Sequence, residues 1–501
     1  MKQHPLRVAV SLSGGGARSA KVPLSPKCME PFMKSVTSPV SDAATALTRA
    51  TRGKAQQLFE LLRDEISKQR LKPGDRLPAT RQLAKQFGVS RNCVTVAFDM
   101  LAADGLISSR VGAGTFVAGT AAGVPDTRSA GNDNVAGLLS DWAHALPAKP
   151  YILAARTARI DFRPGLPNRI GLDACATPMR RAISRLSQAD ISAADVNDPA
   201  GRMRLRTLIA NHLRATRGLP CQASDLVLTS GTHQSLDLIA RLFAGRGAKI
   251  AVEDPCYPLV PKLFRANGFE VSAVPVDEEG MEIAKLGADV KLMYLTPNHQ
   301  FPLGYRLSAQ RRAAVLELAS RQGSFIIEDD YDGELYSVGN LGTCLKADDH
   351  QDRVIYLGSF SKYLFPQLRL GFIVAPKSLR DILIRAKWLM DRQVSLPIQL
   401  CLESLLENGD LLKLVRRSER DYTARLELLR QSVARHLAPH FMLPKNARGF
   451  HIVALADKGF DVASLVQRAL DEGVGIYRLA EFTLESTQDG LLFGLAALSE
   501  R

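Results

Sequence analysis

RVIYLGSFSKYLFPQLRLGFIVA, residues 353–375, is the stretch that decides the fold. Its two ends, Arg353–Leu357 and Leu370–Ala375, are short apolar runs that predict two buried strands. Between them lies a turn with a single lysine, Lys362, preceded by the hydroxyl of Ser359 and followed by the guanidinium of Arg369. The stretch therefore predicts a polar site built at the end of a buried sheet.

These three side chains favour one kind of ligand. A lysine that is partly desolvated next to another cation loses basicity, and its neutral amine can form a Schiff base with an aldehyde. A serine hydroxyl and an arginine are suited to a phosphate group. The simplest ligand with both groups is pyridoxal 5′-phosphate (PLP). The alternative at this point is a surface lysine that follows a strand.

Length and composition indicate a multidomain globular protein. The chain has 501 residues, of which 46% are hydrophobic and 23% charged, and about 100–200 residues per domain is usual. Uninterrupted apolar runs are too short for a membrane span. Seven scattered cysteines without a CxxC pair favour a reduced, cytoplasmic protein with no zinc site and no disulfide framework. We therefore expect no metal and no membrane partner.

The positive charge is concentrated near the N-terminus. The net charge is +14, and residues 46–118 contain twelve Lys/Arg against six Asp/Glu. Such a basic segment is an electrostatic signature of nucleic-acid binding. Residues 1–45, with Gly14-Gly15-Gly16 and many Ser/Thr, predict a disordered extension or a misassigned start whose true initiation lies at Met29 or Met33.

Residues 46–118 predict a winged helix-turn-helix. Apolar spacing indicates helices over Lys54–Gln69, Thr80–Phe87 and Arg91–Ala103. A turn at Gly88 separates the last two helices, and two short strands around Gly112-Ala113-Gly114 form a wing. The second helix of such a unit presents its N-terminal residues to the major groove, which here are Ser90, Arg91, Asn92 and Thr95. Arg81 and Arg110 are candidates for phosphate contacts.

This segment resembles the winged helix of GntR-type bacterial regulators. The resemblance lies in PGDRLPATRQLA, VSRNCVTVAFDMLAADGLI and GAGTFV. It implies that Arg81, Arg91, Thr95 and the wing glycine Gly112 contact double-stranded operator DNA.

After a predicted linker over 119–160, strand and helix patterns alternate from 161 to 501, which indicates an α/β domain with a mainly parallel sheet. Polar groups follow several predicted strands, where open α/β sheets hold ligands. One group is Ser230-Gly231-Thr232-His233, whose backbone N–H groups could face an anion at a helix N-terminus. Another is Glu328–Asp332, which could be a metal site or a solvated loop. An aspartate there could instead keep a pyridine nitrogen protonated.

This half resembles fold-type I PLP enzymes of the aminotransferase class I/II group. TPNHQFPLG, IIEDDYDGE and YLGSFSKYLFPQLRLGF are typical of the MocR subfamily, in which a GntR-type winged helix is fused to an aminotransferase-like domain. The resemblance implies that Lys362 forms the internal aldimine, Asp329 binds the pyridine nitrogen, Tyr331 contacts the ring oxygen and Tyr257 stacks on the ring. It places an effector carboxylate on Arg478. The full set of expected cofactor-binding residues is Lys362, Asp329, Tyr331, Tyr257, Gly231, Thr232, His233, His299, Ser359 and Arg369.

The expected function is a PLP-dependent transcriptional regulator. It would act as a cytoplasmic homodimer and sense PLP itself or an amino compound that forms an external aldimine. The alternative is an active aminotransferase with an accessory DNA-binding domain, because every residue for aldimine formation is present.

Overall fold

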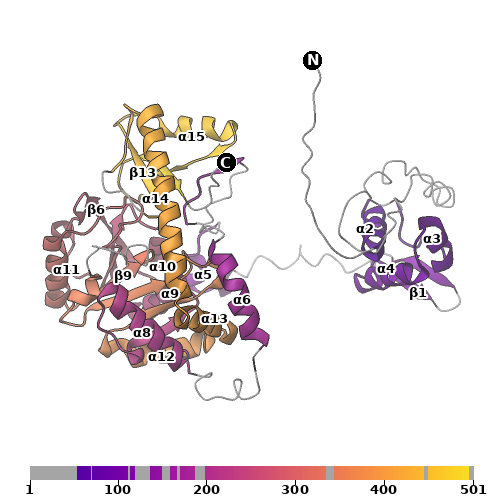
Figure 1. The fold of residues 1–501 in the computed structure, drawn as a ribbon, viewed down its shortest axis with the longest axis horizontal. Helices are drawn as coiled ribbons and strands as arrows, with labels where there is room; N and C mark the ends of the chain where they lie inside the picture. Colours follow the sequence, from indigo (N-terminus) through magenta and orange to yellow (C-terminus); the bar gives the residue numbers. More distant parts are fainter. Residues whose placement is uncertain are drawn as a thin grey trace. The chain divides into compact units, whose positions relative to one another are not determined.

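The computed structural model describes residues 54–68, 70–110, 113–118, 136–148, 158–165, 170–184, 186, 198–333, 343–444 and 449–495. The chain divides into two compact units, one up to Val135 and one from Ala136 (Figure 1). The predicted N-terminal extension, 1–45, lies outside the described residues. In the predicted linker, a short helix, α5 (Asp141–His144), is described and belongs to the second unit.

The first unit is a winged helix, as predicted. It contains α2 (Lys54–Ser67), α3 (Thr80–Phe87) and α4 (Arg91–Ala103), followed by the antiparallel hairpin of β1 (Ile107–Arg110) and β2 (Gly114–Val117). Gly88 ends α3 in the left-handed conformation, with φ 61°. One apolar face of each helix meets in a single core, in which Leu62, Leu83, Val94 and Leu101 are fully buried.

The second unit is built on a mainly parallel sheet. Among the described residues, eight strands form it in the order β4-β11-β10-β9-β8-β5-β6-β7. β11 pairs antiparallel with both of its neighbours, and β7 pairs antiparallel with β6. The strands are β4 (Leu226–Thr229), β5 (Lys249–Asp254), β6 (Glu270–Asp277), β7 (Gly280–Met281), β8 (Leu292–Leu295), β9 (Phe325–Asp330), β10 (Val354–Ser359) and β11 (Gly371–Val374).

Helices cover both faces of this sheet, because its strands carry apolar side chains on both faces. One face, with Val227 and Ile355, packs on α9, α10 and α12. The other face packs on α8 and α13 near Leu228 and on α11 near Ile326. The helices are α6 (Ile170–Ser184), α8 (Met203–Arg217), α9 (Thr232–Phe243), α10 (Leu259–Ala266), α11 (Ala309–Gln322), α12 (Arg380–Asp391) and α13 (Leu396–Glu407).

The C-terminal part of the unit is a smaller antiparallel sheet packed on two helices. Its strands are ordered β12-β13-β16-β15, and the long helix α14 (Asp410–His436) runs beside it (Figure 1). A parallel pair of β3 (Ile160–Asp161) with β14 (Val474–Gly475) ties the start of the unit to its end. The remaining elements are β12 (Phe441–Met442), β13 (His451–Ala456), α15 (Val462–Asp471), β15 (Tyr477–Arg478) and β16 (Gly490–Gly494).

Within the described ranges, no helix combines the length and the apolar character needed to cross a membrane. Parallel strands bring their carboxyl ends to one edge of a sheet, where open α/β folds hold ligands. The residues after β4, β5, β8, β9 and β10 meet at this edge.

Candidate functional site

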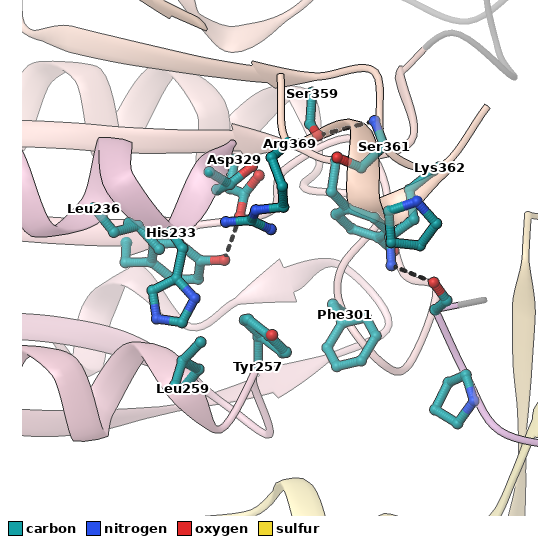
Figure 2. Close-up of a pocket in the computed structure, with 16 residues that line it drawn as sticks. His233, Leu236, Tyr257, Leu259, Phe301, Asp329, Ser359, Ser361, Lys362 and Arg369 are labelled. Carbon is teal, nitrogen blue, oxygen red and sulfur yellow. Dashed lines mark hydrogen bonds between the residues drawn. The ribbon is translucent and has the colours of Figure 1, made fainter. Parts of the chain in front are cut away.

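A cavity of about 340 Å³ lies at this edge of the large sheet (Figure 2). Segments from widely separated parts of the sequence contribute to its wall, from Pro164 to Arg369. Eight residues expected from the sequence line it: Thr232, His233, Tyr257, Asp329, Tyr331, Ser359, Lys362 and Arg369. The pocket therefore brings together most of the predicted cofactor site.

Lys362 is the pocket's amine. It follows β10 on a turn, and its Nζ donates a hydrogen bond of 3.2 Å to the carbonyl oxygen of Gly165 (Figure 2). Burial lowers the pKa of Lys362, while the negative charges of Asp332 and Asp329 act in the opposite direction. The sequence predicted lowered basicity from partial desolvation next to a cation, and in the structure desolvation is the cause of the lowered pKa.

Asp329 has a buried carboxylate group, and its two oxygens differ in their hydrogen bonding. Its Oδ2 accepts a hydrogen bond of 2.8 Å from the Tyr294 hydroxyl. Its Oδ1 is buried and has no hydrogen-bond partner among the described residues. Burial raises the pKa of Asp329 from 3.8 to about 7, although the bond from Tyr294 opposes the shift. A buried acceptor without a partner is costly, so this oxygen is suited to a ligand that brings an N–H group.

Glu328 and Asp330 face away from the cavity, because side chains alternate along β9. Asp330 Oδ2 lies 2.6 Å from Arg217 Nη2 and accepts a hydrogen bond of 2.6 Å from the Tyr356 hydroxyl. Glu328 accepts backbone N–H bonds from Leu345 and Lys346. The run anchors the strand, and no metal-binding cluster occurs among the residues that the structure describes.

Arg369 and the start of α9 form a cradle for an anion. Gly231, with φ 88°, allows the chain to approach Arg369: a Cβ added there would lie 3.2 Å from the guanidinium carbon. The N-terminal N–H groups of α9 begin at Thr232, and helix N-termini attract anions. Ser359 also lines the pocket and accepts a hydrogen bond of 3.2 Å from the backbone N–H of Ser361. This combination of donors fits a phosphate.

Aromatic rings form another wall of the pocket. Tyr257 meets Phe301 edge-to-face, with ring centroids 5.9 Å apart. Burial raises the pKa of the Tyr257 hydroxyl, so its ring is a neutral apolar surface suited to a flat ligand. Phe301, Tyr294 and Gly165 were not predicted as site residues.

Three predicted residues, Gly231, His299 and Arg478, are not among those that line the pocket. His299 is buried behind it, where its Nδ1 lies 2.6 Å from Asp332 Oδ2 and 2.8 Å from the Tyr331 hydroxyl. Arg478 is paired instead with Asp489, at 2.5 Å from Nη2 to Oδ2. Arg478 is therefore not among the cations that face this cavity.

The first unit exposes the side chains expected to contact DNA. Arg81, Arg91, Asn92 and Thr95 are exposed. Ser90 caps α4 by accepting a hydrogen bond of 3.2 Å from the backbone N–H of Cys93. The side chain of Arg110 and all of Gly112 lie outside the described residues.

Fold and site together define a class: a winged helix joined to an aminotransferase-like domain of fold type I. Comparison with known proteins agrees. Bacterial regulatory proteins of the gntR family match residues 54–117, and aminotransferases of class I and II match residues 173–493. The chain belongs to the MocR-type subfamily of GntR regulators.

Individual relatives cover nearly the whole chain. It is 32% identical to the probable rhizopine catabolism regulatory protein MocR of Rhizobium meliloti over 452 residues, which is 89% of this chain and 90% of that protein. It is 31% identical to the pyridoxine biosynthesis transcriptional regulator PdxR of Corynebacterium glutamicum, over 89% and 92% of the two chains. The kynurenine aminotransferase of Pyrococcus horikoshii superposes with a TM-score of 0.66 at 26% identity, over 74% of this chain and 94% of that one.

Proposed function

We propose that this regulator binds PLP in the pocket and that the pocket's occupancy controls its affinity for an operator. The observation that carries the proposal is the open, buried Oδ1 of Asp329, which lies in the same cavity as the amine of Lys362 and the anion cradle around Arg369. A pyridine nitrogen, an aldehyde and a phosphate are the three groups that these side chains would accept. When bound, PLP supplies an aldehyde that condenses with amines and a ring that withdraws electrons.

Each side chain of the pocket has a distinct task in this proposal. Arg369, Ser359 and the first N–H groups of α9 hold the phosphate and fix the orientation of the ring. Asp329 holds a proton at the ring nitrogen. Lys362, whose pKa is lowered by burial, offers an amine that is more readily neutral and therefore nucleophilic. The ring of Tyr257 covers the ligand and excludes water.

Coupling to DNA requires that the ligand favour one arrangement of the protein over another. The effector would be PLP itself or an amino compound that displaces Lys362. The exposed residues at the start of α4, with Arg91 among them, would read the operator bases. A DNA partner implies a cytoplasmic location.

We also propose a homodimer. Helix α12 exposes large apolar side chains: Trp388 is 55% exposed and Leu389 80%. Adjacent apolar side chains with this exposure favour burial against another chain, and a second copy would supply a matching patch by symmetry. Two winged helices in one dimer would bind two operator half-sites.

A second candidate function is transamination. The similarity to aminotransferases extends over residues 173–493 in sequence and over 74% of the chain in structure, and Lys362, Asp329 and Arg369 all line the cavity. Turnover would require that a substrate amine leave its nitrogen on the cofactor and depart as a keto compound.

The absorption spectrum of purified protein with added PLP tests the proposal and separates the two functions. We expect a visible band that is absent from Lys362→Ala, and an operator affinity that changes when PLP or an amine changes the band. A band that decays with release of a keto product would favour the aminotransferase. If no band appears on adding PLP, the cofactor assignment is wrong.

A further inference from the structure

Behind Tyr331 lies a buried chain of hydrogen bonds that includes His299 and Asp332. His299 Nδ1 lies 2.6 Å from Asp332 Oδ2 and 2.8 Å from the hydroxyl of Tyr331. His299 and Asp332 are almost fully buried, with side chains 4% and 2% exposed. Tyr331 lines the pocket, whereas His299 and Asp332 do not. The chain thus connects a buried carboxylate to a hydroxyl at the pocket wall.

The proton positions in this chain follow from its geometry. One nitrogen, Nδ1 of His299, contacts both partners. With Asp332 ionised, the 2.6 Å contact requires that Nδ1 carry a hydrogen and donate it. A protonated Nδ1 cannot accept a hydrogen bond, so the Tyr331 oxygen acts as an acceptor on this side. The hydroxyl hydrogen of Tyr331 is then directed away from His299.

We propose that Asp332 and His299 are positioning residues that turn the hydroxyl hydrogen of Tyr331 into the pocket. There it donates to the phenolic oxygen of the ring of PLP, so this inference rests on the proposed function. The two residues would act through Tyr331 without touching the ligand.

A histidine packs on the ring of Tyr331. His451, from β13, stacks on the Tyr331 ring with centroids 6.3 Å apart and lies 5.4 Å from the His299 ring. Burial and the nearby His299 and Lys362 hold the pKa of His451 well below its usual range, so it packs as a neutral ring. Among the described titratable residues, His299 and His451 contact Tyr331, Asp332 contacts His299, and Lys362 and Asp329 line the same pocket as Tyr331.

The visible absorption band of bound PLP changes as the cofactor loses a proton, and the pH midpoint of this change should shift in a predictable direction when the hydrogen bond from Tyr331 is removed. A donor at the ring oxygen stabilises the deprotonated, more negative form of the bound cofactor. Tyr331→Phe removes the donor, so the midpoint should rise by about one pH unit, the size of a hydrogen bond to a charged group. Asp332→Asn releases Nδ1 to accept from Tyr331, which turns the hydroxyl away and should also raise the midpoint.

If Asp332 acted only through its negative charge, Asp332→Asn would shift the pH midpoint in the opposite direction. Removing a negative charge makes the deprotonated form easier to reach, so a purely electrostatic role would lower the midpoint. His299→Gln gives a second test, since its amide can donate to Asp332 while its carbonyl accepts from Tyr331, and it should also raise the midpoint.

A double-mutant cycle completes the experiment. The inference predicts that Asp332→Asn adds no upward shift to Tyr331→Phe, because the hydroxyl through which it acts is gone. It is overturned if Asp332→Asn and His299→Gln leave the midpoint unchanged or lower it while Tyr331→Phe raises it, or if the upward shifts add in the double variant. A wild-type protein without any PLP band would instead contradict the proposed function itself.

Discussion

Replacing Asp329 by Asn should stabilise the PLP-free protein and lower its affinity for PLP. Without PLP the carboxyl group of Asp329 has a pKa raised by burial from 3.8 to about 7. A folded-state pKa above the unfolded value means that the folded state binds more protons between these pH values, so stability is lost as pH rises toward and through 7. At pH 8 the loss is about 4 kcal/mol.

The asparagine variant avoids this ionisation cost but introduces a smaller one. Its carbonyl can accept the hydrogen bond from Tyr294 that Asp329 Oδ2 accepts, while its amide group lacks an acceptor, which costs about 1–3 kcal/mol. The net effect at pH 8 is therefore a gain of about 1–3 kcal/mol for Asp329→Asn without PLP. Below pH 5 the gain should disappear.

With PLP the stability advantage of the variant should shrink or disappear. An ionised carboxylate that holds a proton at the ring nitrogen contributes about 1.5–3 kcal/mol, so the dissociation constant for PLP should rise about 10- to 150-fold in the variant. Scanning calorimetry of the full chain from pH 5 to 9, with and without PLP, measures both effects. The reasoning is refuted if Asp329→Asn is less stable than wild type without PLP at pH 8, or if PLP stabilises both proteins equally.

Three further perturbations test other parts of the account. Arg91→Ala should lower operator affinity about 5- to 150-fold, the range for one bidentate base contact, while leaving the PLP band intact; unchanged gel-shift affinity would count against α4 as the reading helix. Lys362→Ala should abolish the covalent PLP adduct that borohydride reduction traps in wild type, as measured by intact mass, and an adduct that persists would place the reactive amine elsewhere. Leu389→Glu puts a charge on the exposed apolar face of α12 and should shift sedimentation from dimer to monomer, whereas an unchanged mass would exclude this face as the dimer interface.

Local sequence patterns predicted the site residues that lie at or just after the end of a predicted strand. Lys362 was identified because it lies on a turn after a buried strand, at the ligand-binding edge of the sheet. Asp329 was singled out from its acidic run by the resemblance to aminotransferases. The winged helix was predicted for a similar reason, since the spacing of Leu83, Val94 and Leu101 sets which faces are buried.

Other residues of the site depend on tertiary contacts that no local pattern contains. Tyr294 reaches Asp329 from a neighbouring strand, and Gly165 meets Lys362 from a segment 197 residues away. Tyr294 could have been suspected from strand alternation, because it lies on the same face of β8 as the buried residues that pack on α9. Gly165 and Phe301 offered no comparable signal.

Two role assignments illustrate a different limit. His299 was expected to touch the cofactor because it follows a strand, yet its short contact with Asp332 turns it toward the tyrosine behind the pocket wall. Arg478 was matched to an effector-binding arginine by motif; in the structure it pairs with Asp489, and its effector role stays a prediction. A sequence motif shows where a charged residue lies along the chain. The direction in which its side chain points depends on the nearest opposite charge in the folded protein.

The most direct test of the central claim is the operator affinity of the PLP-free and PLP-loaded protein, measured side by side for wild type and Lys362→Ala. The account predicts a difference of about 5- to 150-fold in wild type, the usual size of coupling between two sites, and a much smaller one in the variant. Equal affinities in wild type with and without PLP, under conditions where the visible band shows that PLP is bound, would contradict the claim that this pocket controls DNA binding.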